Sequence, residues 1–313
     1  MKKNILNMVS VSLLLAGSLS SCQSKQEMDP LVSHIDNSVR PQDDFFNYAN
    51  GTWFKQNPIP ASETSNGIFV AVDDTVNAQI YQICLEAMDA GAPEGSNMQK
   101  IGDLYYSGMD SVTINQNGIK DLLPDLARID AVKSLKELPT MVAYVQTVSS
   151  SPMFRFGIGQ DTKNSSKNTA SLSQGGLSMP DRRYYVENDA NAQEIRAKFV
   201  EYVQGIFQTL GYEDAKARTS AQQLLALETQ LAKDSRKRED LRDPYENYHP
   251  LPFAQVQKLT PDFDFSAFLH ELGLEKVDTI DVGQPEFFTA LNKTLKQFSV
   301  DEWKDYLKFK DVN

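Results

Sequence analysis

The chain has 313 residues and a formal net charge of −11 at pH 7, with 41% hydrophobic and 23% charged residues. This composition is typical of a globular protein with a substantial core, and the length allows one large domain or two ordinary ones. The acidic balance argues against nucleic acid as a partner, because a phosphate backbone is bound by a basic face. The two cysteines, Cys22 and Cys84, exclude a disulfide framework and a cysteine-based zinc site.

Residues 1–21 have the pattern of a signal peptide. Lys2 and Lys3 precede a mostly apolar run from Ile5 to Leu19, which is too short and too rich in serine to span a membrane. The run ends in Leu19-Ser20-Ser21-Cys22, which resembles a bacterial lipobox. We therefore expect Cys22 to be lipidated and to become the mature N-terminus. An ordinary secretory signal with an incidental cysteine is the alternative.

Residues 22–40 are polar, lack a helical apolar stripe and are predicted to form a flexible tether. His34 lies in this tether, and we expect no metal-binding role for it. Two or three acyl chains hold a protein firmly at a membrane, because each buried methylene contributes about 0.8 kcal/mol. The expected location is therefore the bacterial cell envelope, lipid-anchored at the outer membrane or the periplasmic face.

The stretch from Asp43 to Pro60 concentrates five aromatic residues in a short span. Asp43 and Asp44 are predicted to cap a short helix that ends near Asn50-Gly51, since Asn-Gly is a turn dipeptide. Trp53 would then return the chain to the core. Aromatic residues at this density normally bury a large area, so we interpret the stretch as a structural anchor rather than a ligand site.

Helical periodicity dominates the chain from Gly67 to about Val145. The first helix carries apolar residues at three- and four-residue steps, the spacing of one buried face: Ile68, Val72, Val76, Ile80 and Ile83. Cys84 follows them and is interpreted as a small buried hydrophobe rather than a reactive thiol. Further helices are expected at Met98–Met109 and in two segments between Leu122 and Val148, broken at Pro139.

A small β-hairpin is expected near residues 153–172. Residues 153–159 alternate in polarity and contain glycines, residues 160–168 form a polar turn, and residues 169–172 form the returning strand. Four charged residues near the hairpin are Asp161, Asp181, Arg182 and Arg183. They are interpreted as a structural ion-pair cluster in preference to the lip of a substrate site.

The second half of the chain is again helical. Gly211 is expected to cap the helix that spans Ala192–Leu210, because glycine adopts a positive φ without strain. The other helices are expected at residues 213–233, from Phe253, around residues 265–269, at 285–295 and at 301–309. The last one presents three apolar residues, Trp303, Tyr306 and Leu307, which we expect to need packing partners outside the chain.

His270-Glu271 matches the first two residues of a zinc-peptidase helix. That motif needs a second histidine four residues after the first, so that both imidazoles face one metal. Leu274 occupies that position, and the two other histidines, His34 and His249, do not have ligand spacing. The chain also contains no G-x-S-x-G motif and no P-loop. We therefore expect no catalytic residue and no metal ligand in this chain.

Five stretches stand out together: Asp43–Pro60 (DDFFNYANGTWFKQNPIP), Gly159–Asn164 (GQDTKN), Gly175–Tyr185 (GGLSMPDRRYY), Arg242-Asp243-Pro244 with Tyr248 and the following LPFAQVQKL, and Trp303–Phe309. In this order they resemble the N-terminal lobe of the neprilysin and endothelin-converting-enzyme family of zinc metallopeptidases. The resemblance runs from about residue 41 to the end and implies a mainly α-helical, multi-helix lobe over residues 41–313, incomplete at its C-terminus.

The family resemblance implies a function that belongs to a longer protein. Its helical lobe closes over a catalytic lobe that binds Zn²⁺, and oligopeptides are cleaved in the cavity between the two lobes. This chain would then be the substrate-enclosing part of a zinc metalloendopeptidase, inactive alone, with its own catalytic lobe and oligopeptide substrates as partners. A catalytically inactive, surface-exposed binding lipoprotein is the alternative.

One position departs from the family pattern. After the Asn-Pro-Ile-Pro segment, an Arg-aromatic-Gly-x-Phe pattern is expected, whose arginine reaches the C-terminal carboxylate of the substrate. Gly67 and Phe69 fit this pattern, but Ser65 stands where the arginine would be. A serine cannot form the bidentate charged pair that an arginine forms with a carboxylate. We therefore expect endopeptidase behaviour rather than removal of C-terminal dipeptides.

Overall fold

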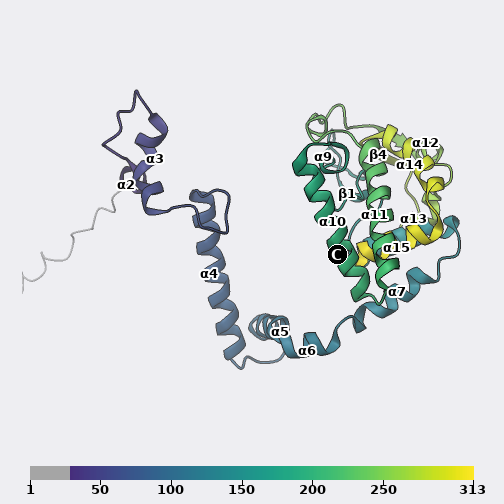
Figure 1. The fold of residues 1–313 in the computed structure, drawn as a ribbon, viewed down its shortest axis with the longest axis horizontal. Helices are drawn as coiled ribbons and strands as arrows, with labels where there is room; N and C mark the ends of the chain where they lie inside the picture. Colours follow the sequence, from purple (N-terminus) through teal and green to yellow (C-terminus); the bar gives the residue numbers. More distant parts are fainter. Residues whose placement is uncertain (1–28) are drawn as a thin grey trace, which may run out of the picture. The chain divides into compact units, whose positions relative to one another are not determined.

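The computed structural model describes residues 29–313, which divide into two compact units with the boundary between Ser111 and Val112 (Figure 1). The stretch predicted as one lobe, residues 41–313, therefore contributes to both units. The predicted signal peptide, residues 1–21, and the predicted lipidation site, Cys22, lie outside the described residues. Within residues 29–313, no helix has both the length and the apolar character needed to cross a membrane.

The first unit is helical throughout its described part. Its helices are α2 (Pro30–His34), α3 (Phe45–Gln56), α4 (Ile68–Asp89) and α5 (Asn97–Met109), and α6 (Ser111–Asn117) begins at the unit boundary. Helix α2 lies where the sequence pattern predicted a tether. It has five residues, too few to show an apolar stripe, and the Asp29 carboxylate caps it by accepting a hydrogen bond from the Leu31 amide at 2.9 Å.

A buried aspartate joins α2 to α3. The Asp36 carboxylate accepts a hydrogen bond from Lys55 Nζ at 2.5 Å and one from the Ser38 hydroxyl at 2.6 Å. The hydrogen bond from Lys55 and those from Ser38 lower the pKa of Asp36 to about 2. Thr52 Oγ1 also donates to the Ile35 carbonyl at 2.8 Å. Residues 35–38 of the predicted tether are thus fixed to α3.

Helix α3 begins as predicted but ends later. The Asp44 carboxylate caps it by accepting from the Asn47 amide at 2.9 Å. The helix then continues through Gly51 to Gln56, so the prediction of a turn at Asn50-Gly51 is wrong. Gly51 instead permits a close approach, because an added Cβ would lie 2.9 Å from the Asp36 Cβ. The N-terminal aromatic residues Phe45 and Phe46 are 69% and 59% exposed, contrary to the expected burial.

Helices α4 and α5 pack against each other near the C-terminal end of α4. Gly102 lies so close to α4 that an added Cβ would be 2.6 Å from the Ala87 carbonyl oxygen. The predicted buried face of α4, formed by Ile68, Val72, Val76, Ile80 and Ile83, is 43–55% exposed. The periodicity thus identified an apolar face correctly. It did not predict whether other residues of the chain cover that face. Cys84, expected to be buried, is half-buried in this helix.

The second unit is an α-helical body with a four-stranded sheet. The strands are β1 (Phe154–Gln160), β2 (Asn168–Gln174), β3 (Pro250–Pro252) and β4 (Thr279–Val282), in the spatial order β1-β2-β4-β3. β1 and β2 form the predicted antiparallel hairpin, β4 pairs parallel to β2, and β3 pairs antiparallel to β4. The sequence pattern missed β3 and β4 because they have three and four residues, too few for a clear alternation.

The helices of the second unit follow the predicted pattern with two exceptions: α9 was not predicted, and Pro139, the predicted break, lies in the first turn of α8. They are α7 (Leu123–Asp130), α8 (Leu138–Val148), α9 (Arg183–Val186), α10 (Ala190–Thr209), α11 (Asp214–Asp234), α12 (Phe253–Leu259), α13 (Phe265–Glu271), α14 (Pro285–Gln297) and α15 (Val300–Val312). Gly211 caps α10 as expected, with φ of +87° and a hydrogen bond from the Tyr212 amide to the Phe207 carbonyl at 3.0 Å.

The core of the second unit encloses the last helix. Helix α15 packs against α7, α8, α10 and α11 (Figure 1). Trp303, Tyr306 and Leu307 are each 0% exposed, and Trp303 meets Tyr306 edge-on at 5.6 Å between ring centroids. The expectation that these residues need partners outside the chain is therefore wrong. The residues that cover them come from distant parts of the chain, which the local pattern of α15 does not reveal.

Candidate functional site

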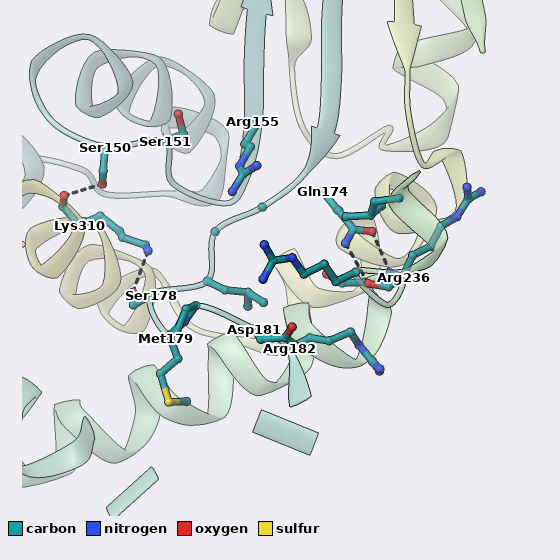
Figure 2. Close-up of a pocket in the computed structure, with 17 residues that line it drawn as sticks. Ser150, Ser151, Arg155, Gln174, Ser178, Met179, Asp181, Arg182, Arg236 and Lys310 are labelled. Carbon is teal, nitrogen blue, oxygen red and sulfur yellow. Dashed lines mark hydrogen bonds between the residues drawn. The ribbon is translucent and has the colours of Figure 1, made fainter. Parts of the chain in front are cut away.

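The second unit contains a hollow of about 750 Å³ at the end of the β1–β2 hairpin that is remote from its turn (Figure 2). We call it the arginine hollow, and its lining residues are Ser150, Ser151, Arg155, Gln174, Gly175, Gly176, Leu177, Ser178, Met179, Pro180, Asp181, Arg182, Ser235, Arg236, Arg238, Leu241 and Lys310. Its size lies within the range of small-ligand sites, roughly 300–1,000 Å³.

The loop that follows β2 is fixed by a buried tyrosine. The Tyr306 hydroxyl donates to the Gly176 carbonyl at 2.8 Å and accepts from the Met153 amide at 2.9 Å. Gly176 has φ of +79°, and an added Cβ would lie 2.8 Å from both the Met153 carbonyl oxygen and the Tyr306 hydroxyl. Met153 itself has φ of +61°, which is uncommon for a residue with a side chain. One hydroxyl thus joins three distant chain segments at the wall of the hollow.

A second buried group holds the next residues of the same loop. Glu228 of α11 is 0% exposed and accepts hydrogen bonds from the Ser178 hydroxyl at 2.6 Å and from the Tyr185 hydroxyl at 2.5 Å. Lys310 Nζ lies 3.6 Å from the same carboxylate and donates to Ser178 Oγ at 2.8 Å. Burial raises the pKa of Tyr185 and lowers that of Lys310. A buried carboxylate needs such partners, so the loop is positioned strongly.

The charge of the hollow is opposite to that of the whole chain. Its lining includes five basic side chains, Arg155, Arg182, Arg236, Arg238 and Lys310, and one carboxylate, Asp181. Viewed in Figure 2, Lys310 lies on one side and Arg236 on the other, with Arg155 between them.

Some of these basic groups are already paired. Arg236 forms an ion pair with Glu286 at 2.5 Å, and Arg182 Nε donates to the Ala232 carbonyl at 3.0 Å. Arg155 and Arg238 are exposed, and within residues 29–313 their guanidinium groups have no hydrogen-bond or ion-pair partner. The hollow therefore presents uncompensated positive charge to solvent.

The predicted ion-pair cluster of Asp161, Asp181, Arg182 and Arg183 is not formed. Asp161 accepts a hydrogen bond from the Tyr248 hydroxyl at 3.0 Å, and the Arg183 guanidinium lies 4.8 Å from the centroid of the Tyr184 ring. Asp181 and Arg182 line the arginine hollow.

The three histidines have different neighbours. His270 lies in the last turn of α13 and lines a second hollow, and its neighbour Glu271 pairs with Arg128 at 2.5 Å. His249 Nδ1 lies 3.0 Å from the Val282 carbonyl oxygen, and the His34 ring lies 6.3 Å from that of Trp53. In the part of the chain that the structure describes, no three residues among His, Cys, Asp and Glu are grouped so that they fit a metal ion. These residues therefore do not fit zinc.

The sequence pattern did not single out Arg155, Arg238 or Lys310. Arg155 lies in a strand that was recognised only by its alternation, and Lys310 lies beyond the last predicted helix. One signal was available, the run Arg236-Lys237-Arg238 in a chain of net charge −11. Ser65, the departure from the family pattern, lies exposed in the first unit just before α4.

A family model described as "Peptidase family M13" matches residues 41–313, which is most of the chain. The chain belongs to peptidase family M13. This confirms the predicted resemblance to neprilysin and endothelin-converting enzyme, and also the mainly helical fold with a small hairpin. It further supports a metallopeptidase family for the chain.

Curated relatives in the M13 family extend well beyond this chain. An endothelin-converting enzyme homolog of Locusta migratoria is 26% identical over 285 residues, which cover 86% of this chain and 39% of that protein. Human endothelin-converting enzyme 1 is 29% identical over 252 residues, which cover 77% of this chain and 32% of that protein. The chain thus spans less than half the length of these relatives.

A solved structure of a zinc metalloprotease has a similar fold. The zinc metalloprotease ZMP1 of Mycobacterium tuberculosis, in complex with an inhibitor, matches with a TM-score of 0.81 and 28% identity, covering 90% of this chain and 43% of that chain. A structure described as PepO from Lactobacillus rhamnosis matches at 14% identity with a TM-score of 0.71, which shows the shared fold.

Four of the five stretches that carry the M13 resemblance lie in the second unit, where hydrogen bonds join them in two pairs. Asp161 of GQDTKN binds Tyr248, and Gly176 of GGLSMPDRRYY binds Tyr306 of the stretch Trp303–Phe309. These hydrogen bonds fix Asp161 beside Tyr248 at the turn of the hairpin and Gly176 beside Tyr306 at the arginine hollow.

Proposed function

We propose that this chain is the N-terminal, non-catalytic part of an M13 zinc metalloendopeptidase. The match of the M13 model to residues 41–313 is the observation that carries this proposal. Oligopeptides would be cleaved in a cavity between this part and a catalytic lobe. We place the Zn²⁺ ligands outside this sequence, because the described residues offer no suitable group of side chains. Zinc in such peptidases polarises the scissile carbonyl and activates water.

The activity proposed here belongs to a protein longer than this chain, because relatives are covered only to 32–43% of their length. We propose that the 313-residue chain alone does not hydrolyse peptides. The test is to express the reading frame that contains this sequence together with its downstream region. Hydrolysis of an internally quenched oligopeptide is then measured for that protein and for the 313-residue chain, each with and without a metal chelator.

The expected result is chelator-sensitive cleavage inside the peptide by the longer protein and none by the chain alone. Chelator-resistant cleavage, or cleavage by the chain alone, would contradict the proposal. A longer protein that binds the peptide but leaves it intact would favour the other class of function, a catalytically inactive binding lipoprotein.

Ser65 supports the proposal of endopeptidase specificity. We expect the longer protein to show little preference for peptides with a free C-terminal carboxylate over the same peptides amidated, because serine cannot form a bidentate pair with a carboxylate. The variant Ser65→Arg should raise the ratio of kcat/KM for free over amidated peptides by about tenfold. An unchanged ratio would show that residue 65 does not face the substrate carboxylate.

We also propose that the protein is a lipoprotein of the bacterial envelope, anchored through Cys22. The Leu19-Ser20-Ser21-Cys22 sequence supports this, and residues 1–21 would be removed. Incorporation of labelled palmitate and recovery in the membrane fraction test it. Cys22→Ser should abolish both, whereas Cys84→Ser, which changes the other cysteine, should abolish neither. Equal labelling of the two variants would refute the anchor.

A further inference from the structure

We propose that the arginine hollow is a subsite for the side-chain carboxylate of an aspartate or glutamate in a bound peptide. The claim that the ligand is a peptide rests on the proposed function. The claim that the hollow binds carboxylates rests on the side chains that line it.

The first step is the availability of donors. Arg155 and Arg238 are exposed and, among the residues that the structure describes, have no partner, while Arg182 uses only its Nε to bind the Ala232 carbonyl. An arginine offers five N–H donors in a planar fork that matches the two oxygens of a carboxylate. Three arginines therefore direct unused donors to one hollow.

The second step is the way in which the arginines are held. Gly175 lies against the backbone and stem of Arg155, since an added Cβ would be 3.0 Å from the Arg155 amide nitrogen and 3.1 Å from its Cγ. Gln174 binds the Arg236 backbone twice, accepting from its amide at 2.8 Å and donating to its carbonyl at 3.1 Å (Figure 2). This clamp fixes the segment that carries Arg238. Preorganised donors lose less entropy on binding.

The third step is the balance of nearby acids. The Glu228 carboxylate is already bound by Ser178, Tyr185 and Lys310. Glu286 is already paired with Arg236. Asp181 accepts from the Arg183 amide at 2.9 Å and is the one carboxylate among the lining residues. It neutralises at most one of the three arginines, so the hollow keeps a net positive charge that a ligand carboxylate can balance.

The fourth step is the type of anion. The chain carries a net charge of −11, so its overall field repels extended polyanions such as nucleic acids. A small anion avoids most of this repulsion, because charges beyond about 10 Å are screened at 0.1 M salt. The hollow of about 750 Å³ admits part of a peptide. A peptide bearing a carboxylate satisfies both the charge and the size.

The test measures peptide binding to the 313-residue chain by isothermal titration calorimetry, so it requires neither zinc nor hydrolysis. Three acetylated hexapeptide probes are compared: alanines with two aspartates and an amidated end, alanines with two asparagines and an amidated end, and alanines with a free carboxylate end. Failure of peptide hydrolysis by the longer protein would leave this result unaffected.

We expect the aspartate probe to bind about tenfold more tightly than the asparagine probe, whereas the probe with a free carboxylate end should bind no more tightly than the asparagine probe. Arg155→Gln and Arg238→Gln should each weaken binding of the aspartate probe about fivefold. The control Arg218→Gln removes an exposed arginine of α11 outside the hollow and should leave binding unchanged. Because all three substituted positions are exposed, the variants should keep the melting temperature of the parent chain.

Three outcomes would overturn the proposal. They are equal binding of the aspartate and asparagine probes, tighter binding of the free-carboxylate probe than of the aspartate probe, and equal weakening by Arg218→Gln and Arg155→Gln. The last outcome would show a general charge effect rather than a subsite.

Discussion

Replacement of Gly176 by alanine tests whether the loop beside the arginine hollow is fixed by the Tyr306 hydroxyl. At φ of +79°, the added Cβ would lie 2.8 Å from the Met153 carbonyl oxygen and 2.8 Å from the Tyr306 hydroxyl. The Met153 oxygen belongs to the backbone and Tyr306 is 0% exposed, so neither neighbour can move aside freely. The control is Gly211→Ala, because Gly211 has φ of +87° but an added Cβ there meets nothing within 4 Å.

The expected cost separates into two parts. A residue with a Cβ in the left-handed region costs roughly 1–2 kcal/mol, and both variants incur this cost. Gly176→Ala also displaces the Tyr306 hydroxyl from the Gly176 carbonyl and the Met153 amide. A buried polar group left without a partner costs about 1–3 kcal/mol. We therefore expect Gly176→Ala to lower the free energy of unfolding by about 1–3 kcal/mol more than Gly211→Ala.

The assay is urea denaturation followed by tryptophan fluorescence in a Trp53→Phe background, which leaves the buried Trp303 of the second unit as the reporter. The extra cost should shrink in a Tyr306→Phe background, where there is no hydroxyl to displace. Equal costs of Gly176→Ala and Gly211→Ala, within about 0.5 kcal/mol, would refute the reasoning.

Three further changes probe other parts of the chain. Burial raises the pKa of Asp311 to about 6, so the native state binds this proton more tightly and the free energy of unfolding falls as pH rises from about 4 to 6. Asp311→Asn should remove this pH dependence and raise the free energy of unfolding at pH 7 by about 1–2 kcal/mol, a figure that allows for solvent screening. Urea titrations at a series of pH values measure this. If the variant's stability still fell with pH as steeply as that of the parent chain, the explanation would be wrong. Gly102→Ala places a Cβ 2.6 Å from the Ala87 carbonyl oxygen and should weaken the α4–α5 contact by about 1–3 kcal/mol. The control Gly108→Ala lies in the same helix, and its Cβ meets nothing within 4 Å. It should stabilise α5 by up to about 1 kcal/mol. Hydrogen exchange of α4 and α5 amides measures both, and equal effects would argue against the close contact. Trp303→Ala should lower the free energy of unfolding, measured by urea denaturation, by about 3–5 kcal/mol, because Trp303 is 0% exposed. A decrease below about 1 kcal/mol would mean that α15 is not part of the core.

Local signals in the sequence predicted local structure well. The β1–β2 hairpin, the Asp44 cap and the Gly211 cap each depend on residues a few positions apart, and all three are found. The burial of α4 and α15 was predicted wrongly in opposite directions. An apolar face indicates a need for a partner, but its spacing carries no information about which distant segment supplies one.

The candidate site could not be predicted for a related reason. The Gly175–Tyr185 stretch was singled out from sequence, yet its role follows from Tyr306 and Glu228, which lie 130 and 50 residues from their partners Gly176 and Ser178. The free charge of Arg155 and Arg238 becomes visible only when the partners of the other basic residues are known. Pairing, rather than residue type, distinguishes these arginines.

The dependence of the loop on α15 has a consequence during synthesis of the protein. Tyr306 fixes Gly176, Lys310 Nζ donates to Ser178, and the Ser150 hydroxyl donates to the Lys310 carbonyl at 2.7 Å. Residues 175–180 are therefore made long before the helix that orders them. Until α15 has docked, this loop is open to proteases and the wall of the hollow is incomplete. The hollow is thus completed in a late folding step, irrespective of how early the arginines themselves are made.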